Sequence, residues 1–287
     1  MSTLLKIEFS LVEEKADEAG VFIATKVPHG WEETPIEGGR KFTIFLEDHP
    51  LGMEMIRDFQ SRFPGIDIKH SEQESEDWAV AWKDFFNPVN CGETFKILPP
   101  WLEDEEDNGT THIVIEPKMA FGTGHHPTTS LCLATIGELA QKGAIKEGQD
   151  FLDLGTGSGI LAIGLCKLGL KGTGLDIDPQ AIVCAVENVE KNKVSDDVNL
   201  AVGSIESVAK ELQFDLLVAN ILSGPLIEMA VDITSHVKLG GSLVLSGILA
   251  GPQGDAVVEA YERRGIGHPE RFQDGEWECL VWEKVGV

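Results

Sequence analysis

The chain has 287 residues, of which 42% are hydrophobic, and a formal net charge of −25 at pH 7. This length and hydrophobic content suit one large domain, or a large domain and a small one. The acidic charge disfavours general binding to a nucleic-acid backbone, which needs clustered Lys and Arg, and it favours a basic partner. Solubility or a salt-adapted host explains the same charge equally well.

The chain carries no signal for a membrane or for disulfide bonds. No apolar run approaches the ~20 residues of a membrane-spanning helix, and the first residues become acidic too soon for a signal peptide. Cysteines are scattered without a Cys-x-x-Cys pair, and Cys132, Cys166 and Cys184 lie in apolar helical patterns. We expect a cytoplasmic protein with reduced core cysteines and no contact with a membrane.

The first 70 residues predict a small α+β unit with the element order βαββαβ, which is typical of a ferredoxin-like fold. Strands are expected near residues 4–10, 21–27, 41–47 and 66–69, and the second helix near 51–63. The first helix has room for only about two turns and is rich in charged residues. Residues 1–70 are therefore assigned to a first domain.

A polar run over residues 70–77 is the best candidate for a linker. Trp78, Trp82, Phe85 and Phe86 follow at roughly helical spacing. We interpret residues 71–90 as a linker and a short helix that docks onto the next domain, in preference to a platform for stacking bases.

Strand and helix patterns then alternate to the end of the chain. Over residues 95–117, two apolar strands flank an acidic turn with Asn108-Gly109, which is the signal of a β-hairpin. The later alternation is typical of a doubly wound α/β sheet. Residues 91–287 are therefore assigned to a second, larger domain.

Residues 119–129 form a glycine-containing loop, with Phe121 and Thr128-Thr129, that leads into an apolar helix. Such a loop can fold over a ligand, and its hydroxyls can cap the helix or bind a carboxylate. A simple helix cap explains the threonines but not the glycines and Phe121. No metal site is expected at His125-His126, because adjacent side chains point in different directions and no third ligand accompanies them.

The most informative stretch is Asp153-Leu154-Gly155-Thr156-Gly157-Ser158-Gly159, which links a predicted buried strand to an apolar helix. Glycine at alternate positions permits positive φ and removes Cβ atoms, so backbone N–H groups can face a carboxylate or phosphate. A dinucleotide fingerprint would need a glycine at Ile160. A tight turn without a ligand is the alternative interpretation.

Asp176 makes a nucleotide cofactor the favoured interpretation. It ends the next predicted strand, where a Rossmann-like sheet places the carboxylate that binds both ribose hydroxyls. Asp178, which Pro179 follows, is predicted to be a helix N-cap.

The run D-x-G-x-G-x-G resembles motif I of the class I S-adenosylmethionine-dependent methyltransferases. Together with residues 119–129, 215–226 and 245–249, it closely resembles the ribosomal protein L-eleven methyltransferase family, PrmA. The resemblance covers residues 78–285. It implies a Rossmann-like seven-strand α/β domain that transfers methyl groups from S-adenosyl-L-methionine to amino groups of a basic ribosomal protein. A small recognition domain would precede it.

The resemblance also implies site residues. Asp153 would lie near the amino group of the methionine moiety, and Ser204, after the strand over 198–202, would lie near the adenine. The expected cofactor contacts are Thr129, Asp153, Gly155, Gly157, Asp176, Ser204 and Asn220.

Asn220 is the expected catalytic residue, because a neutral amide oxygen can orient an amine without holding an ammonium as a carboxylate would. An Asn that closes a strand-to-helix turn is the alternative. Ile221-Leu222 replaces the Pro-Pro-aromatic of methyltransferases that act on planar amides and bases, so lysine is the favoured acceptor. Trp277 is predicted to pack within a late strand.

Three hypotheses remain at this point. The favoured activity is methylation of lysine side chains of the ribosomal protein, with its N-terminal α-amine as a second acceptor, by a monomeric enzyme. Because the first helix is predicted to be short and polar, a lysine of a different protein is the first alternative. A nucleotide-binding module or an NAD-linked oxidoreductase is the second.

Overall fold

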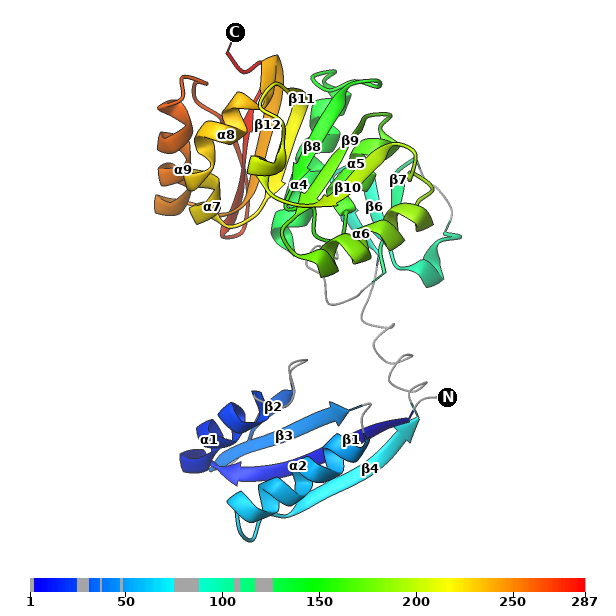
Figure 1. The fold of residues 1–287 in the computed structure, drawn as a ribbon, viewed down its shortest axis with the longest axis vertical. Helices are drawn as coiled ribbons and strands as arrows, with labels where there is room; N and C mark the ends of the chain where they lie inside the picture. The colour runs from blue at the N-terminus through cyan, green and yellow to red at the C-terminus, as the bar shows by residue number, and fades with distance from the viewer. Residues whose placement is uncertain are drawn as a thin grey trace. The chain divides into compact units, whose positions relative to one another are not determined.

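The computed structural model describes residues 3–24, 31–36, 38–46, 49–74, 88–105, 109–116 and 126–286. The chain divides into two compact units, Met1–Phe86 and Asn87–Val287, which are drawn in Figure 1. The predicted docking helix with Trp78, Trp82, Phe85 and Phe86 lies outside the described residues, as do Asn108 and the loop over 119–125.

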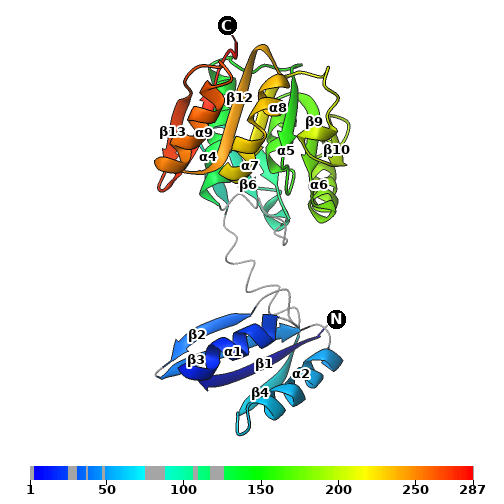
Figure 2. The ribbon, with the colours of Figure 1, turned by 60° about the vertical axis from the view of Figure 1, so that its left-hand side comes forward.

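The first unit is a four-stranded antiparallel sheet in the order β2-β3-β1-β4, packed against two helices (Figure 2). Apolar residues of α1 and α2 share one core with alternate residues of β1 and β3, so both helices cover the same face of the sheet. The predicted order βαββαβ is confirmed. The elements are β1 Thr3–Val12, α1 Glu13–Ala24, β2 Glu32–Ile36, β3 Gly39–Leu46, α2 His49–Arg62 and β4 Ile68–Glu74.

Two details of the first helix differ from the prediction. The strand expected from residue 21 is wrong, because residues 21–24 form the end of α1, and that helix has 12 residues instead of two turns. Ala16, Ala19 and Ile23 recur at helical spacing and are fully buried against the sheet. This packing outweighs the strand propensity of Val21, Phe22 and Ile23. The helix therefore gives no reason to expect a different protein substrate.

The second unit contains a seven-stranded sheet in the order β10-β9-β8-β11-β12-β14-β13 (Figure 1). The strands from β10 to β12 are parallel, whereas β14 pairs antiparallel with both β12 and β13. This arrangement confirms the predicted Rossmann-like sheet. The strands are β8 Asp150–Leu154, β9 Lys171–Asp176, β10 Val198–Val202, β11 Phe214–Asn220, β12 Val237–Leu249, β13 Glu270–Asp274 and β14 Trp277–Trp282.

Helices cover both faces of this sheet because its strands are apolar on both sides. Along β8, Phe151 contributes to the core beneath α4, α5 and α6, whereas Leu152 and Leu154 contribute to the core beneath α7, α8 and α9. All five cysteines are buried and free, as predicted. The helices are α4 Pro127–Gln141, α5 Ile160–Lys167, α6 Pro179–Lys191, α7 Ser223–Glu228, α8 Ala230–Ser235 and α9 Pro252–Glu262. None of the helices in the described ranges is long and apolar enough to span a membrane.

A small three-stranded sheet precedes the main one and corrects a second prediction. Strand β5 (Val89–Cys91) pairs antiparallel with β6 (Phe95–Leu98), but β6 pairs parallel with β7 (Thr111–Val114), so the predicted hairpin is wrong. A 3-10 helix, Pro100–Leu102, takes the chain out of the sheet directly after β6. The connection from β6 to β7 spans residues 99–110, and a connection of this length allows a parallel pair where a two-residue turn does not.

Candidate functional site

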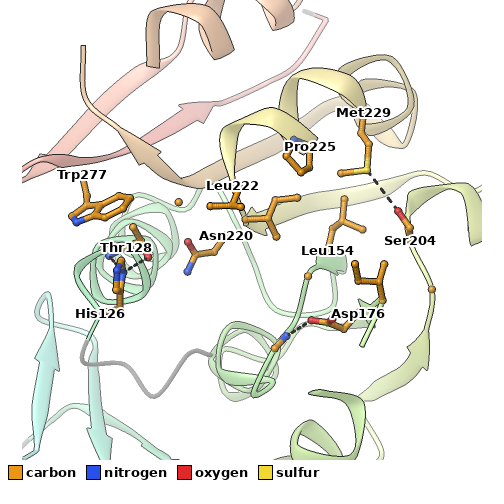
Figure 3. Close-up of a pocket in the computed structure, with 16 residues that line it drawn as sticks. His126, Thr128, Leu154, Asp176, Ser204, Asn220, Leu222, Pro225, Met229 and Trp277 are labelled. Carbon is orange, nitrogen blue, oxygen red and sulfur yellow. Dashed lines mark hydrogen bonds between the residues drawn. The ribbon is translucent and has the colours of Figure 1, made fainter. Parts of the chain in front are cut away.

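A cavity of about 540 Å³ lies at the carboxyl ends of the parallel strands (Figure 3). Leu154, Asp176 and Asn220, the last residues of β8, β9 and β11, all line it. The chain order of the strands reverses between β8 and β11, and ligands of doubly wound sheets bind at this switch point. Of the expected site residues, those that line the cavity are Gly155, Gly157, Asp176, Ser204 and Asn220.

The glycine loop has the backbone geometry that its sequence predicts. Gly155, Gly157 and Gly159 all have positive φ, of 76°, 55° and 81°. A Cβ atom on Gly155 would lie 2.3 Å from the side chain of Ile221, the residue after β11, so glycine allows the loop to approach it this closely. The N–H of Gly155 donates to the carbonyl of Leu175, at 2.8 Å, which ties the loop to β9.

Asp176 is half-buried, and both of its carboxylate oxygens are oriented by the backbone. One accepts a hydrogen bond from the N–H of Gly157 at 2.9 Å, and the other from the N–H of Asp178 at 3.0 Å. Each oxygen keeps a lone pair for a further donor. Asp178 caps α6 through a bond from the N–H of Gln180, as predicted.

Asp153 lies behind the cavity wall and is not one of the lining residues. It is fully buried, and its Oδ2 accepts hydrogen bonds from Thr156 Oγ1 at 2.6 Å and from the N–H of Ala162 at 3.2 Å. Its Oδ1 is buried without a hydrogen-bond partner among the described residues. Burial raises the pKa of Asp153 to about 7. The contacts of this carboxyl group stabilise the glycine loop from beneath.

The two amide atoms of Asn220 have different surroundings. Its Nδ2 donates to Thr129 Oγ1, at 3.2 Å, which links β11 to α4. Thr129 itself is fully buried and lies outside the cavity lining. The Oδ1 of Asn220 is buried and has no partner within the part of the chain that the structure describes. A hydrogen-bond acceptor without a partner in the protein is suited to a ligand that donates an N–H.

Trp277 and His126 form a wall of the cavity that the sequence did not predict. Their ring centroids lie 5.0 Å apart with an edge-on geometry, and both residues line the cavity (Figure 3). Trp277 lies in a late strand, β14, as expected, and its ring packs against His126, but it also lines the cavity. The position of Trp277 follows from the sheet topology. Because β14 runs antiparallel to β12, its first residue lies at the carboxyl edge of the parallel strands.

Apart from Thr128, the remaining side chains that line the cavity without having been predicted are apolar. Met229, in the turn between α7 and α8, places its sulfur 3.6 Å from Ser204 Oγ, and Ile177 and Leu222 lie on the rim with exposed side chains. Figure 3 shows Asn220 between a group with Trp277 and a group with Asp176 and Ser204. Within the described ranges, no cluster of His, Cys, Asp or Glu could hold a metal ion.

The sheet order, the glycine loop and the carboxylate at the end of β9 define a Rossmann-like fold of the methyltransferase class. Comparison with known proteins then identifies the particular family. The model of the ribosomal protein L11 methyltransferase (PrmA) family matches residues 15–285, and the chain belongs to this family. The resemblance inferred from the sequence is thereby confirmed.

Individual relatives agree with this assignment. The ribosomal protein L11 methyltransferase of Chromohalobacter salexigens is 39% identical over 241 residues, which cover 82% of this chain and 77% of that protein. The enzyme of the same name from Escherichia coli is 41% identical over 223 residues, with 77% and 70% covered. The crystal structure of ribosomal protein L11 methylase from Lactobacillus delbrueckii subsp. bulgaricus has a TM-score of 0.61 and 29% identity. It matches 70% of this chain and 100% of that one.

Proposed function

We propose that this protein transfers methyl groups from S-adenosyl-L-methionine to lysine side chains of ribosomal protein L11, with the N-terminal α-amine of that protein as a second acceptor. The observation that carries the proposal is the unpartnered Oδ1 of Asn220, a residue that lines the same cavity as the oriented carboxylate of Asp176. One group suits an amine, and the other suits a ribose.

The residues around Asp176 fit the nucleoside part of the cofactor. Its two oxygens are fixed by backbone N–H groups and can accept from two vicinal hydroxyls. Ser204, Met229 and Ile177 supply a hydroxyl and apolar side chains around the same end of the cavity, where a base would pack. When bound, S-adenosylmethionine supplies a methyl group activated by a positively charged sulfur.

The opposite end of the cavity fits a lysine that must lose its proton. Holding a lysine neutral at pH 7 costs about 4.6 kcal/mol, from an ordinary pKa of about 10.4. The apolar walls of Leu222 and Trp277 lower the pKa of a buried amine by desolvation. Asp176 is the one carboxylate among the described lining residues, and it lies at the other end (Figure 3).

Asn220 then orients the neutral amine. Its Oδ1 can accept an N–H of the incoming nitrogen, while its Nδ2 is held by Thr129 and fixes the direction of the amide. Since methyl transfer is an in-line displacement, this orientation contributes directly to the rate. The proposed working unit is a cytoplasmic monomer that does not bind nucleic acid, in keeping with its net charge of −25.

Calorimetry with S-adenosylhomocysteine and with NAD tests the cofactor assignment. We expect the first to bind and the second not to bind. Mass spectrometry of purified ribosomal protein L11 after incubation with enzyme and S-adenosylmethionine should show gains in steps of one methyl mass. Strong binding of NAD alone would refute the methyltransferase proposal. If L11 stays unmodified while another protein of a cell extract takes up labelled methyl groups, that protein would replace L11 as the proposed substrate.

A further inference from the structure

Two buried asparagines lie four residues apart, Asn188 within α6 and Asn192 directly after the last residue of that helix. Asn192 pairs with both backbone groups of Val114, since its Oδ1 accepts from the N–H at 2.9 Å and its Nδ2 donates to the carbonyl at 2.6 Å. The Oδ1 of Asn188 accepts from the N–H of Glu116 at 3.1 Å. The two amides thus satisfy backbone groups at the end of β7, at Val114, and just after it, at Glu116, much as a neighbouring strand would.

Asn188, unlike Asn192, also contacts the glycine loop. Its Nδ2 donates to the carbonyl of Ser158 at 2.9 Å, and Ser158 lies between Gly157 and Gly159 in the glycine loop. Asn188 is completely buried, so water cannot replace this bond. One amide therefore joins the edge of β7 to the loop that lines the cavity.

Helix α6 also packs closely against the glycine loop at Gly159. A Cβ atom on Gly159 would lie 3.2 Å from the Cβ of Ala185, which is one turn before Asn188 on the helix. The loop residues Gly157 and Gly159 both have positive φ, and glycine loses the most conformational freedom on ordering. A loop of this composition needs external contacts to keep one conformation.

We infer that Asn188 is a positioning residue for the cofactor, which it does not itself contact. By holding the Ser158 carbonyl, it keeps Gly157 in the conformation in which its N–H orients the Asp176 carboxylate. Loss of the bond frees the loop, and the entropy of ordering it must then be supplied on binding. This inference rests on the proposed function, since it takes S-adenosylmethionine as the ligand of the loop.

The experiment compares Asn188→Ala with Asn192→Ala. Both variants remove amides that pair with β7, so both should lower the melting temperature. Only Asn188→Ala should also raise the Kd for S-adenosylhomocysteine and the KM for S-adenosylmethionine, by about tenfold, while kcat at saturating cofactor stays within about threefold. Asn192→Ala should leave both constants within about twofold of the wild type.

A second variant, Asn188→Asp, separates the loop contact from folding. It keeps an acceptor for the N–H of Glu116, and in its ionised form it has no donor for the Ser158 carbonyl. Because burial raises the pKa of a carboxyl group, the variant should raise the same Kd at alkaline pH, and binding should recover at lower pH, where the protonated O–H can donate to Ser158. Unchanged binding by both Asn188 variants, or equal loss in Asn192→Ala, would overturn the inference. If the wild type itself fails to bind S-adenosylhomocysteine, the proposed function fails, and the inference fails with it.

Discussion

Asn220 combines a fixed donor with a free acceptor, and the proposed chemistry needs only the acceptor. Asn220→Ala should lower kcat for methylation by on the order of 100-fold, because the amine loses its orientation. The Kd for S-adenosylhomocysteine should change only a few-fold, since Asp176 and the glycine loop remain. Steady-state kinetics and calorimetry measure the two effects. Unchanged turnover would refute the role of this residue.

The isosteric variant Asn220→Asp tests the reason for an amide at this position. A carboxylate would hold the acceptor lysine as an ammonium and raise its pKa. We therefore expect the pH profile of kcat to move toward higher pH than in the wild type. A profile that keeps its midpoint would show that charge at this position does not control the protonation of the acceptor.

Asp153 should make the stability of the protein depend on pH. Because burial raises its pKa from an ordinary 3.8 to about 7, the folded protein holds a proton that the unfolded chain releases within that window. Its contribution to the free energy of unfolding therefore falls as pH rises from about 4 to about 7, and is constant above. Urea denaturation of wild type and Asp153→Asn across this range measures the effect.

Asn preserves the shape of this side chain and an acceptor for Thr156 and Ala162, but it does not titrate. The Asp153→Asn variant should therefore show a flatter dependence of unfolding free energy on pH than the wild type. Parallel curves for the two proteins would contradict the elevated pKa.

At the scale of elements, the close approach of β12 to the residue after its parallel neighbour β11 requires glycine. Gly247 has a φ of 84°, and a Cβ atom there would lie 2.3 Å from the carbonyl oxygen of Ile221. Gly247→Ala must displace the peptide next to Asn220, so it should weaken folding and also methylation. Denaturation and steady-state kinetics measure both losses.

Gly148→Ala is the matched control for this substitution. Gly148 has nearly the same φ, 83°, but no atom lies within 4 Å of its Cβ direction. Gly148→Ala should lower the free energy of unfolding only by the penalty for a positive φ in a residue with a Cβ atom, about 1–2 kcal/mol. The value of kcat should be unchanged. Equal stability losses in the two variants would show that the contact with Ile221 contributes nothing.

The sequence correctly predicted those features of the fold that depend on residues close together in the chain. The strand before the glycine loop, the carboxylate of Asp176 and the cap at Asp178 are of this kind, because apolar runs, glycines and capping side chains act over one turn or strand. The extent of α1 could not be predicted in this way. It depends on burial of Ala16, Ala19 and Ile23 against a sheet formed by distant residues.

The rest of the site depends on topology that single residues do not reveal. Trp277 reaches the cavity only because β14 runs against its neighbours, and Met229 does so from a turn between two short helices. Asp153 lies behind the wall because side chains alternate along β8, which places it on the same face as Phe151. The sequence motif thus identified the glycine loop, but it did not show which of the site residues face the cavity and which lie behind its wall.

At the scale of the whole molecule, each of the two units has a core of its own. In the first unit, the ring of Phe9 stacks on that of Phe42 and lies 4.6 Å from that of Phe59 between centroids. Every described residue that lines the cavity belongs to the second unit. Since domains with separate cores can fold separately, cofactor binding and recognition of the protein substrate are proposed to reside in different units.

A fragment that comprises residues 87–287 tests this division. It should bind S-adenosylhomocysteine with a Kd within about twofold of the full chain, because it contains the entire described cavity. Its kcat/KM for ribosomal protein L11 should fall by at least about 100-fold, because binding energy from remote parts of a substrate is lost with the first unit. A short lysine peptide, which cannot reach the first unit, is the control and should react equally with both proteins. Equal activity of the fragment on L11 would contradict the recognition role, since the first unit would then be dispensable for the substrate that gives the family its name.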